Sequence, residues 1–133
     1  MRAADSSLII AAFASWHEKH DAARQALDAG IRIVEHCALE TYSVLTRLPA
    51  PHRASGEVVR DFLRARLEQP ALRLSIKAHR EFLMSLPERG VAGGAVYDAL
   101  VAATAAEHQA ELLSCDRRAS ATYERYGIRF EVL

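Results

Sequence analysis

Three aspartates and one glutamate stand where carboxylates can act together: Asp5, Glu40, Asp98 and Asp116. Carboxylates that converge repel one another, so each needs a raised pKa or a counter-charge. A divalent cation supplies that charge, and a site with only oxygen ligands selects a hard ion such as Mg²⁺ or Mn²⁺. Such an ion can activate water for attack on a phosphodiester and stabilise the leaving oxygen. Together, the four acids predict a metal-dependent phosphoryl-transfer site.

Three of the acids stand at the end of a predicted strand or inside an apolar helix. Asp5 ends the first apolar segment, and Asp116 directly follows "ELLSC". Asp98 is the one group ionised at neutral pH between residues 95 and 106. A helix as apolar as this one is expected to be buried, and burying a lone carboxylate is costly unless something compensates it.

Glu40 falls on an apolar face of a predicted helix. Steps of three and four residues join Cys37, Val44 and Leu48 on one face, and Glu40 lies on the same face. Taken singly, the acids have simpler explanations. Asp5, Asp98 and Asp116 all stand at helix starts, where Asp is a favoured cap, and Glu40 is a surface residue if the helix is rotated.

Strands and helices must alternate to position these acids. Strands are predicted at 2–5, 31–36, 72–75, 111–115 and 128–133, separated by helices at 6–14, 16–30, 37–48, 57–69, 76–86, 93–110 and 117–127. Strands separated by helices imply crossover connections and a parallel sheet covered on both faces. We therefore expect an α/β three-layer sandwich with a central, mostly parallel sheet of about five strands, forming a single domain over residues 1–133.

The predicted parallel sheet also predicts where the acids lie in space. Ligands of parallel α/β sheets bind at the carboxyl ends of the strands. Asp5 and Asp116 each end a strand, so both are expected at the same edge of the sheet. Asp98 opens a helix after a glycine-rich loop and is expected near that edge as well.

The composition of the chain argues against several other functional classes of protein. The chain carries 17 basic and 17 acidic side chains, so its net charge argues against a large phosphate-binding surface. The two cysteines, Cys37 and Cys115, do not have CxxC spacing, so both are expected to be reduced thiols. The apolar run "LIIAAFA" is too short to cross a membrane, and the N-terminus lacks the features of a signal peptide. A cytoplasmic protein without membrane association is expected.

Four segments carry a resemblance to a known family: "ADSSLIIAAF", "ALETYSVLTRL", "YDALVAATAAEHQAELLSCDRRA" and "YERYGIRFEVL". In this order they resemble a PIN domain, specifically the VapC-type toxin ribonucleases of bacterial toxin–antitoxin pairs. The resemblance implies Mg²⁺- or Mn²⁺-dependent endonucleolytic cleavage of RNA, a cognate antitoxin as partner, and a homodimer.

Matched motif by motif, the resemblance assigns Asp5, Glu40, Asp98 and Asp116 as catalytic and metal-binding residues. Ser7 matches the small hydroxyl residue after the first aspartate, and Ser114 stands where relatives more often have Thr; both are assigned a supporting role. Arg117 and Arg118 directly follow Asp116 and are candidates for contact with RNA phosphate.

The sequence departs from the family pattern in two places. "MRAAD" lacks the Val/Ile run that usually precedes the first aspartate, so a short first strand is expected. "RRASATY" offers no further acid or amide after Asp116, which leaves a second metal ion open.

Three alternatives compete with the nuclease. "HEKH" at 17–20 is not the HExxH motif of zinc enzymes, and an exposed helix face explains it better. A receiver-like signalling domain also gathers aspartates at strand ends, but it needs a Lys near the last strand. Neither Lys19 nor Lys77 lies there. A catalytically silent PIN-like binding module is the third alternative, against which the presence of all four acids argues.

Overall fold

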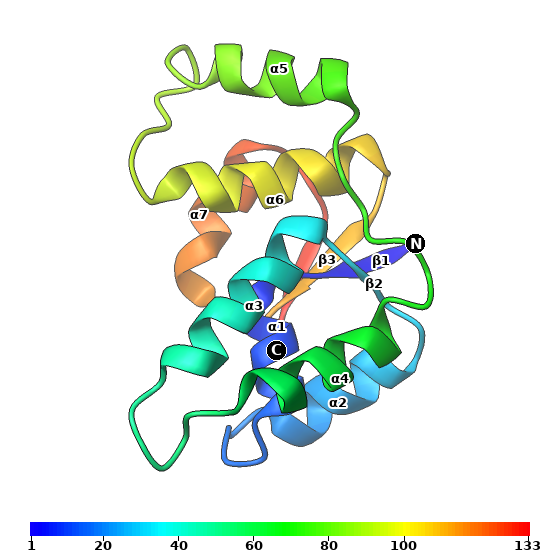
Figure 1. Ribbon diagram of the computed structural model, residues 1–133. Coiled ribbons are helices and arrows are strands. Elements are labelled where there is room, and N and C mark those ends of the chain that lie inside the picture. Colours follow the sequence, from blue (N-terminus) through cyan, green and yellow to red (C-terminus); the bar gives the residue numbers. More distant parts are fainter.

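The computed structural model describes residues 1–133 (Figure 1). In chain order the elements are β1 (Arg2–Ala4), α1 (Ser6–Phe13), α2 (His20–Asp28), β2 (Arg32–Ile33), α3 (Glu35–Arg47), α4 (Gly56–Arg66), α5 (Ile76–Ser85), α6 (Ala95–Glu107), β3 (Glu111–Ser114), the 3₁₀ helix η1 (Arg117–Ala119), α7 (Ser120–Arg125) and β4 (Phe130–Val132). The predicted alternation of strands and helices is confirmed.

Four parallel strands form one sheet in the order β2-β1-β3-β4. The segment predicted as a further strand at 72–75 contributes only a single parallel bridge between Leu72 and Val34. Leu72 N–H donates to the Ile33 carbonyl at 2.8 Å, and the Leu72 carbonyl accepts from Glu35 N–H at 2.8 Å. The pairing stops there because Ser75 already caps α5, its hydroxyl accepting from Ala78 N–H.

The chain changes direction across the sheet between β1 and β3. From β1 the chain moves outward to β2 on one side, and from β3 it moves outward to β4 on the other. A crevice forms outside the carboxyl ends of strands where the order reverses in this way. Asp5 and Asp116 follow these two central strands, and Asp5 N–H donates to the Leu113 carbonyl at 3.1 Å.

Helices cover both faces of the sheet (Figure 1). Helices α1 to α4 pack as one group, with α1 against both α2 and α3, while α6 packs with α7 across the sheet. Helix α5 lies on the outer side of α6, where Phe82 and Leu86 join Ala99 in a small second core. No helix in the structure is both long and apolar enough to span a membrane.

One detail of the packing differs from the sequence prediction, and another agrees with it. The amphipathic pattern of residues 57–69 predicts Val58 on the core face of that helix. On α4, Val59 is fully buried and Val58 is exposed, so this prediction is wrong. The first strand is short, as expected, and its residues Ala3 and Ala4 are fully buried in the centre of the sheet.

Candidate functional site

One small pocket brings the four acids together. It has a volume of about 170 Å³ and opens beyond the carboxyl ends of β1 and β3. Its lining consists of Asp5, Ser6, Ser7, Ile10, His36, Glu40, Tyr97, Asp98, Val101, Asp116 and Tyr123. Of the residues predicted from sequence, only Ser114, Arg117 and Arg118 are outside this lining.

Asp5 is buried and held by three hydrogen bonds. Its Oδ1 accepts from the Ser7 hydroxyl at 2.6 Å and from Leu8 N–H at 3.1 Å, which caps α1. Its Oδ2 accepts from the Tyr123 hydroxyl at 2.8 Å. Burial raises the pKa of the Asp5 carboxyl, and the hydrogen bonds oppose this rise. The carboxyl group therefore has a fixed orientation toward the pocket.

The two serines connect the ends of β1 and β3. Ser7 Oγ lies 3.1 Å from Ser114 Oγ and accepts from Cys115 N–H at 2.7 Å. Ser114 Oγ in turn accepts from Asp116 N–H at 3.0 Å. Ser114 is fully buried, so it positions Asp116 from below the pocket rather than lining it.

Asp116 and Asp98 differ in how they are held. Asp116 caps η1, with its Oδ1 accepting from Arg118 N–H at 2.9 Å. Asp98 lies in the first turn of α6, but Gly94 is the N-cap residue, so the capping explanation does not apply to Asp98. Burial raises the pKa of the Asp98 carboxyl, and the charges of Asp116, Asp5 and Glu40 add to this rise.

Glu40 lies at the edge of the pocket rather than in the core. The buried face of α3 consists of Cys37, Thr41 and Leu45, so the apolar face assigned from sequence is rotated relative to the true one. Glu40 Oε2 lies 3.5 Å from His36 Nε2, a nitrogen that is buried without a hydrogen-bond partner. The ring of His36 stacks on Tyr97, with centroids 5.2 Å apart and planes 4° apart.

The two arginines after Asp116 point outward. Both are exposed, and Arg118 Nε lies 3.4 Å from Asp116 Oδ1 at the rim of the pocket. Their contact with RNA phosphate stays a prediction.

The histidines of "HEKH" are used locally: His20 Nδ1 lies 2.9 Å from the Ala11 carbonyl, and His17 Nδ1 accepts from Lys19 N–H at 3.0 Å. Both cysteines are free, as expected, and burial raises the pKa of the Cys115 thiol to about 11. Neither the two histidines nor the two cysteines form a second candidate catalytic or metal-binding site.

Tyr123, His36 and Tyr97 were not predicted from the sequence. Tyr123 comes from α7 and reaches Asp5 from 118 positions away. No local sequence pattern predicts such a contact, because it depends on how α7 packs against the sheet. His36 and Tyr97 are close in sequence to Glu40 and Asp98, and that proximity is the one signal that could have identified them.

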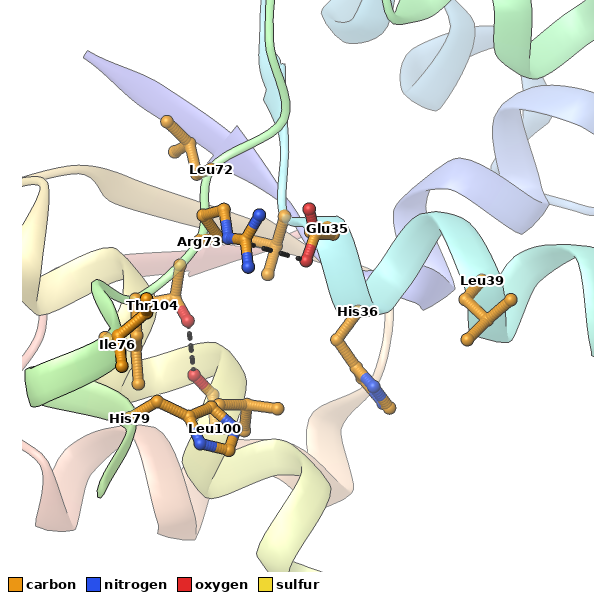
Figure 2. Close-up of a pocket in the computed structure, with 11 residues that line it drawn as sticks. Glu35, His36, Leu39, Leu72, Arg73, Ile76, His79, Leu100 and Thr104 are labelled. Carbon is orange, nitrogen blue, oxygen red and sulfur yellow. Dashed lines mark hydrogen bonds and ion pairs between the residues drawn. The ribbon is translucent and has the colours of Figure 1, made fainter. Parts of the chain in front are cut away.

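A larger, mainly apolar groove adjoins the acidic pocket and shares His36 with it. The groove has a volume of about 480 Å³ and lies between the start of α3, the segment before α5, and α6. Figure 2 shows Arg73 facing Glu35 across it, with Nε 3.8 Å from Oε1. At its margin Leu39 and Ile76 are 73% and 90% exposed.

The acidic pocket has the donor chemistry of a site for a hard divalent cation. Its four carboxylates come from four separate segments, and no Lys or Arg lines it. Burial is the largest cause of the raised pKa of Asp98, and the repulsion by the other carboxylates, which adds to it, is the effect that a cation would relieve. No three acidic, His or Cys side chains stand close enough to form a ready-made metal-binding group, so binding would require side-chain movement.

Comparison with known proteins identifies the family. Residues 3–125 match the PIN domain family model. The chain therefore belongs to the PIN-domain family, which excludes the receiver-like alternative.

The chain is 45% identical over 133 residues to Ribonuclease VapC40 of Mycobacterium tuberculosis, strains CDC 1551 / Oshkosh and ATCC 25618 / H37Rv, spanning 100% of this chain and 99% of the relative. It is 40% identical over 136 residues to Ribonuclease VapC27 of strain ATCC 25618 / H37Rv, spanning 98% of this chain and 95% of that relative. The predicted resemblance to the VapC type is confirmed.

Proposed function

We propose that the protein is a divalent-metal-dependent endoribonuclease that cleaves RNA phosphodiester bonds. The observation that carries this proposal is the convergence of four carboxylates on one pocket whose lining contains no Lys or Arg. The names of the relatives, Ribonuclease VapC40 and Ribonuclease VapC27, support the RNA-cleaving part of this proposal. Asp5, Glu40, Asp98 and Asp116 would hold Mg²⁺ or Mn²⁺ and so form the catalytic centre.

The bound ion would supply the charge that activates water and stabilises the leaving oxygen. The protein's own part is positioning. The hydroxyls of Ser7 and Tyr123 fix the two oxygens of Asp5, and Ser114 fixes the backbone of Asp116. Glu40 and Asp98, which no hydrogen bond fixes, are free to orient the attacking water for in-line displacement at phosphorus.

The direct test is RNA cleavage with and without EDTA, comparing wild type with Asp5→Ala and Asp98→Asn. Asp98→Asn is the cleaner variant, because Asp5 also caps α1 and its loss affects folding. A second measurement is the shift in melting temperature on adding Mg²⁺, which is expected for wild type and lost in Asp98→Asn. Cleavage that survives both chelation and substitution would contradict the proposal, and a Mg²⁺ shift without cleavage would favour the catalytically silent module.

We also propose that the protein acts as the growth-inhibiting toxin of a VapBC-type pair, and that a cognate antitoxin docks beside the acidic pocket and places a basic side chain into it. The adjoining groove supports this, since its exposed Leu39 and Ile76 suit an apolar segment and the neighbouring carboxylates suit a cation. Ile76→Asp is expected to weaken antitoxin binding, measured by calorimetry, while leaving RNA cleavage unchanged. Equal antitoxin affinity in this variant would remove the groove from the interface.

Homodimer formation stays a prediction from the family resemblance. Sedimentation velocity of the isolated protein tests it: a species of twice the chain mass is expected, and a monomer at all concentrations would contradict it.

A further inference from the structure

Two aromatic ring pairs, one stacked and one tilted, lie at opposite ends of α3. At its first turn, His36 stacks on Tyr97 of α6. Beyond its last turn, in the loop before α4, His52 packs on Trp16 of the α1–α2 loop, with centroids 4.4 Å apart and planes 36° apart. Tyr97 and Trp16 are 55% and 49% exposed. In each pair a histidine supports a large aromatic ring that leaves about half of its residue's surface in solvent.

One face of α3 leads from the first ring pair toward the end of the helix that precedes the second. Steps of four, three and four residues place His36, Glu40, Ser43 and Arg47 on this face. Glu40 lines the acidic pocket. At the other end the Arg47 guanidinium is held in place, Nη1 donating to Ser43 Oγ at 2.6 Å. At a rise of 1.5 Å per residue, Arg47 lies about 10 Å along the helix from Glu40.

A second guanidinium is fixed at the same end of α3. Arg53 Nε donates to the Leu48 carbonyl at 2.8 Å, and both Arg47 and Arg53 are exposed. From the acidic pocket along α3 the surface therefore offers the Tyr97 ring, the Ser43 hydroxyl, two oriented cations and, beyond the helix, the Trp16 ring.

This sequence of groups suits single-stranded nucleic acid. Proteins bind single strands by stacking unpaired bases on aromatic rings and by placing cations near the phosphates. In a duplex the bases are paired and stacked internally, so the two rings would find no exposed base face. From His36 to Arg47, α3 rises about 16 Å, which corresponds to about five nucleotides at a spacing of 3.4 Å. The second ring pair lies beyond Arg47, so a single strand of more than about five nucleotides can contact both pairs at once.

We propose that single-stranded RNA crosses the acidic pocket and follows α3, with one base stacked on Tyr97 beside the scissile phosphate and a second base stacked on Trp16. Arg47 and Arg53 neutralise phosphates between them. This inference rests on the proposed ribonuclease function and adds the course of the substrate over the surface.

Trp16 is the single tryptophan of the chain, so intrinsic fluorescence reports on it alone. The full-length protein is titrated in EDTA, and the Asp98→Asn protein in Mg²⁺, with a 12-nucleotide single-stranded RNA randomised at every position. Quenching of Trp16 emission is expected with the single strand and not with a 12-base-pair RNA duplex. Equal quenching by both, or none while the single strand is bound, would overturn the proposal.

Fluorescence anisotropy of the labelled single strand tests each contact. Trp16→Ala and Tyr97→Ala are each expected to weaken binding at least about five-fold, and Trp16→Phe and Tyr97→Phe to restore most of it. Leu83→Ala, which truncates an exposed apolar side chain on α5, is the matched control and is expected to bind like wild type. Wild-type affinity in both alanine variants would remove the rings from the path.

The salt dependence of binding tests the cations. Arg47→Ala is expected to reduce the slope of log affinity against log salt by about 0.7, as for one lost phosphate contact on a single strand. Arg129→Ala, an exposed arginine just before β4 at the opposite edge of the sheet, is expected to leave the slope unchanged. Equal slopes in the two variants would exclude Arg47.

The experiments separate an error in the RNA path from an error in the proposed ribonuclease function. RNA cleavage with no effect of the ring substitutions would overturn the path alone. Ring-dependent RNA binding without cleavage would support the path and count against the nuclease. Quenching of Trp16 by an antitoxin but not by RNA would overturn the path and assign the ring pairs to a protein contact.

Discussion

The acidic pocket and the apolar groove share His36, yet they differ in the feature that matters for chemistry. The groove is the larger, at about 480 Å³ against about 170 Å³. Its one acid, Glu35, faces Arg73, whereas four carboxylates line the pocket without a Lys or Arg among them. Arg118 at the rim pairs with one of these four acids, Asp116. An excess of carboxylates over cations on converging groups, rather than volume or apolar lining, marks the place where a cation and a reaction are expected.

The largest effect that separates the two regions is expected in cleavage. Asp98→Asn should lower kcat/KM for RNA at least about 100-fold, since even partners that only orient a metal ligand cost 10–100-fold when lost. Glu35→Gln, the matched change in the groove, should stay within about two-fold of wild type. Comparable losses of kcat/KM in both variants would show that cleavage depends on the groove as much as on the pocket.

The second effect concerns the support beneath the pocket. Tyr123→Phe removes a hydrogen bond to the buried Asp5 carboxyl and should lower the free energy of unfolding by about 1.5–3 kcal/mol, measured by urea titration. The control is Tyr126→Phe, because the Tyr126 hydroxyl is buried without a partner. Its loss should be neutral or stabilising, and a larger cost for Tyr126→Phe would contradict this assignment.

A smaller, pH-dependent effect should follow from the charge of Asp98. Its pKa is raised in the folded protein, so the stability it contributes is present at low pH and is lost as the pH rises through that raised value. Without metal, Asp98→Asn should therefore be more stable than wild type at pH 7 and equal to it at pH 3. Added Mg²⁺ should reverse the order at pH 7. A variant that is less stable at pH 7 without metal would show that the carboxylate has a structural role.

The smallest effect is expected in the groove itself. Arg73 and Glu35 form an exposed ion pair, with side chains 68% and 56% exposed. Arg73→Ala should change the free energy of unfolding by less than about 1 kcal/mol and leave RNA cleavage unaltered. A larger loss of stability in urea would mean that the pair holds the start of α3 in place.

The acids could be anticipated from sequence because their positions follow a general rule of parallel sheets. Asp5 ends one predicted strand and Asp116 directly follows another, and the structure places both at one edge, together with Glu40 and Asp98. Their roles as ligands stay a prediction. The strand predicted at 72–75 is too long, since alternation of apolar and polar residues indicates extended backbone but not how many residues find a partner.

Other features depended on information that local sequence does not contain. The placement of Val58 and the apolar face assigned to α3 were rotational errors, because a shift of one residue turns a helix by about 100°. The hydrogen bond from Tyr123 to Asp5 and the stacking of His36 on Tyr97 join separate elements. Such contacts arise from tertiary packing and have no signature in either segment alone.

The double use of Asp5, as helix cap and as pocket wall, has a consequence for ion choice. Two of the four carboxylates, Asp5 and Asp116, are anchored to the backbone of the helices that follow them, while Glu40 and Asp98 are not. A cage rigid on all sides would discriminate sharply by ionic radius, whereas one with two adjustable walls can close to different metal–oxygen lengths. We therefore expect the protein to accept Mg²⁺ and Mn²⁺ alike, with the half contributed by α3 and α6 adapting to each.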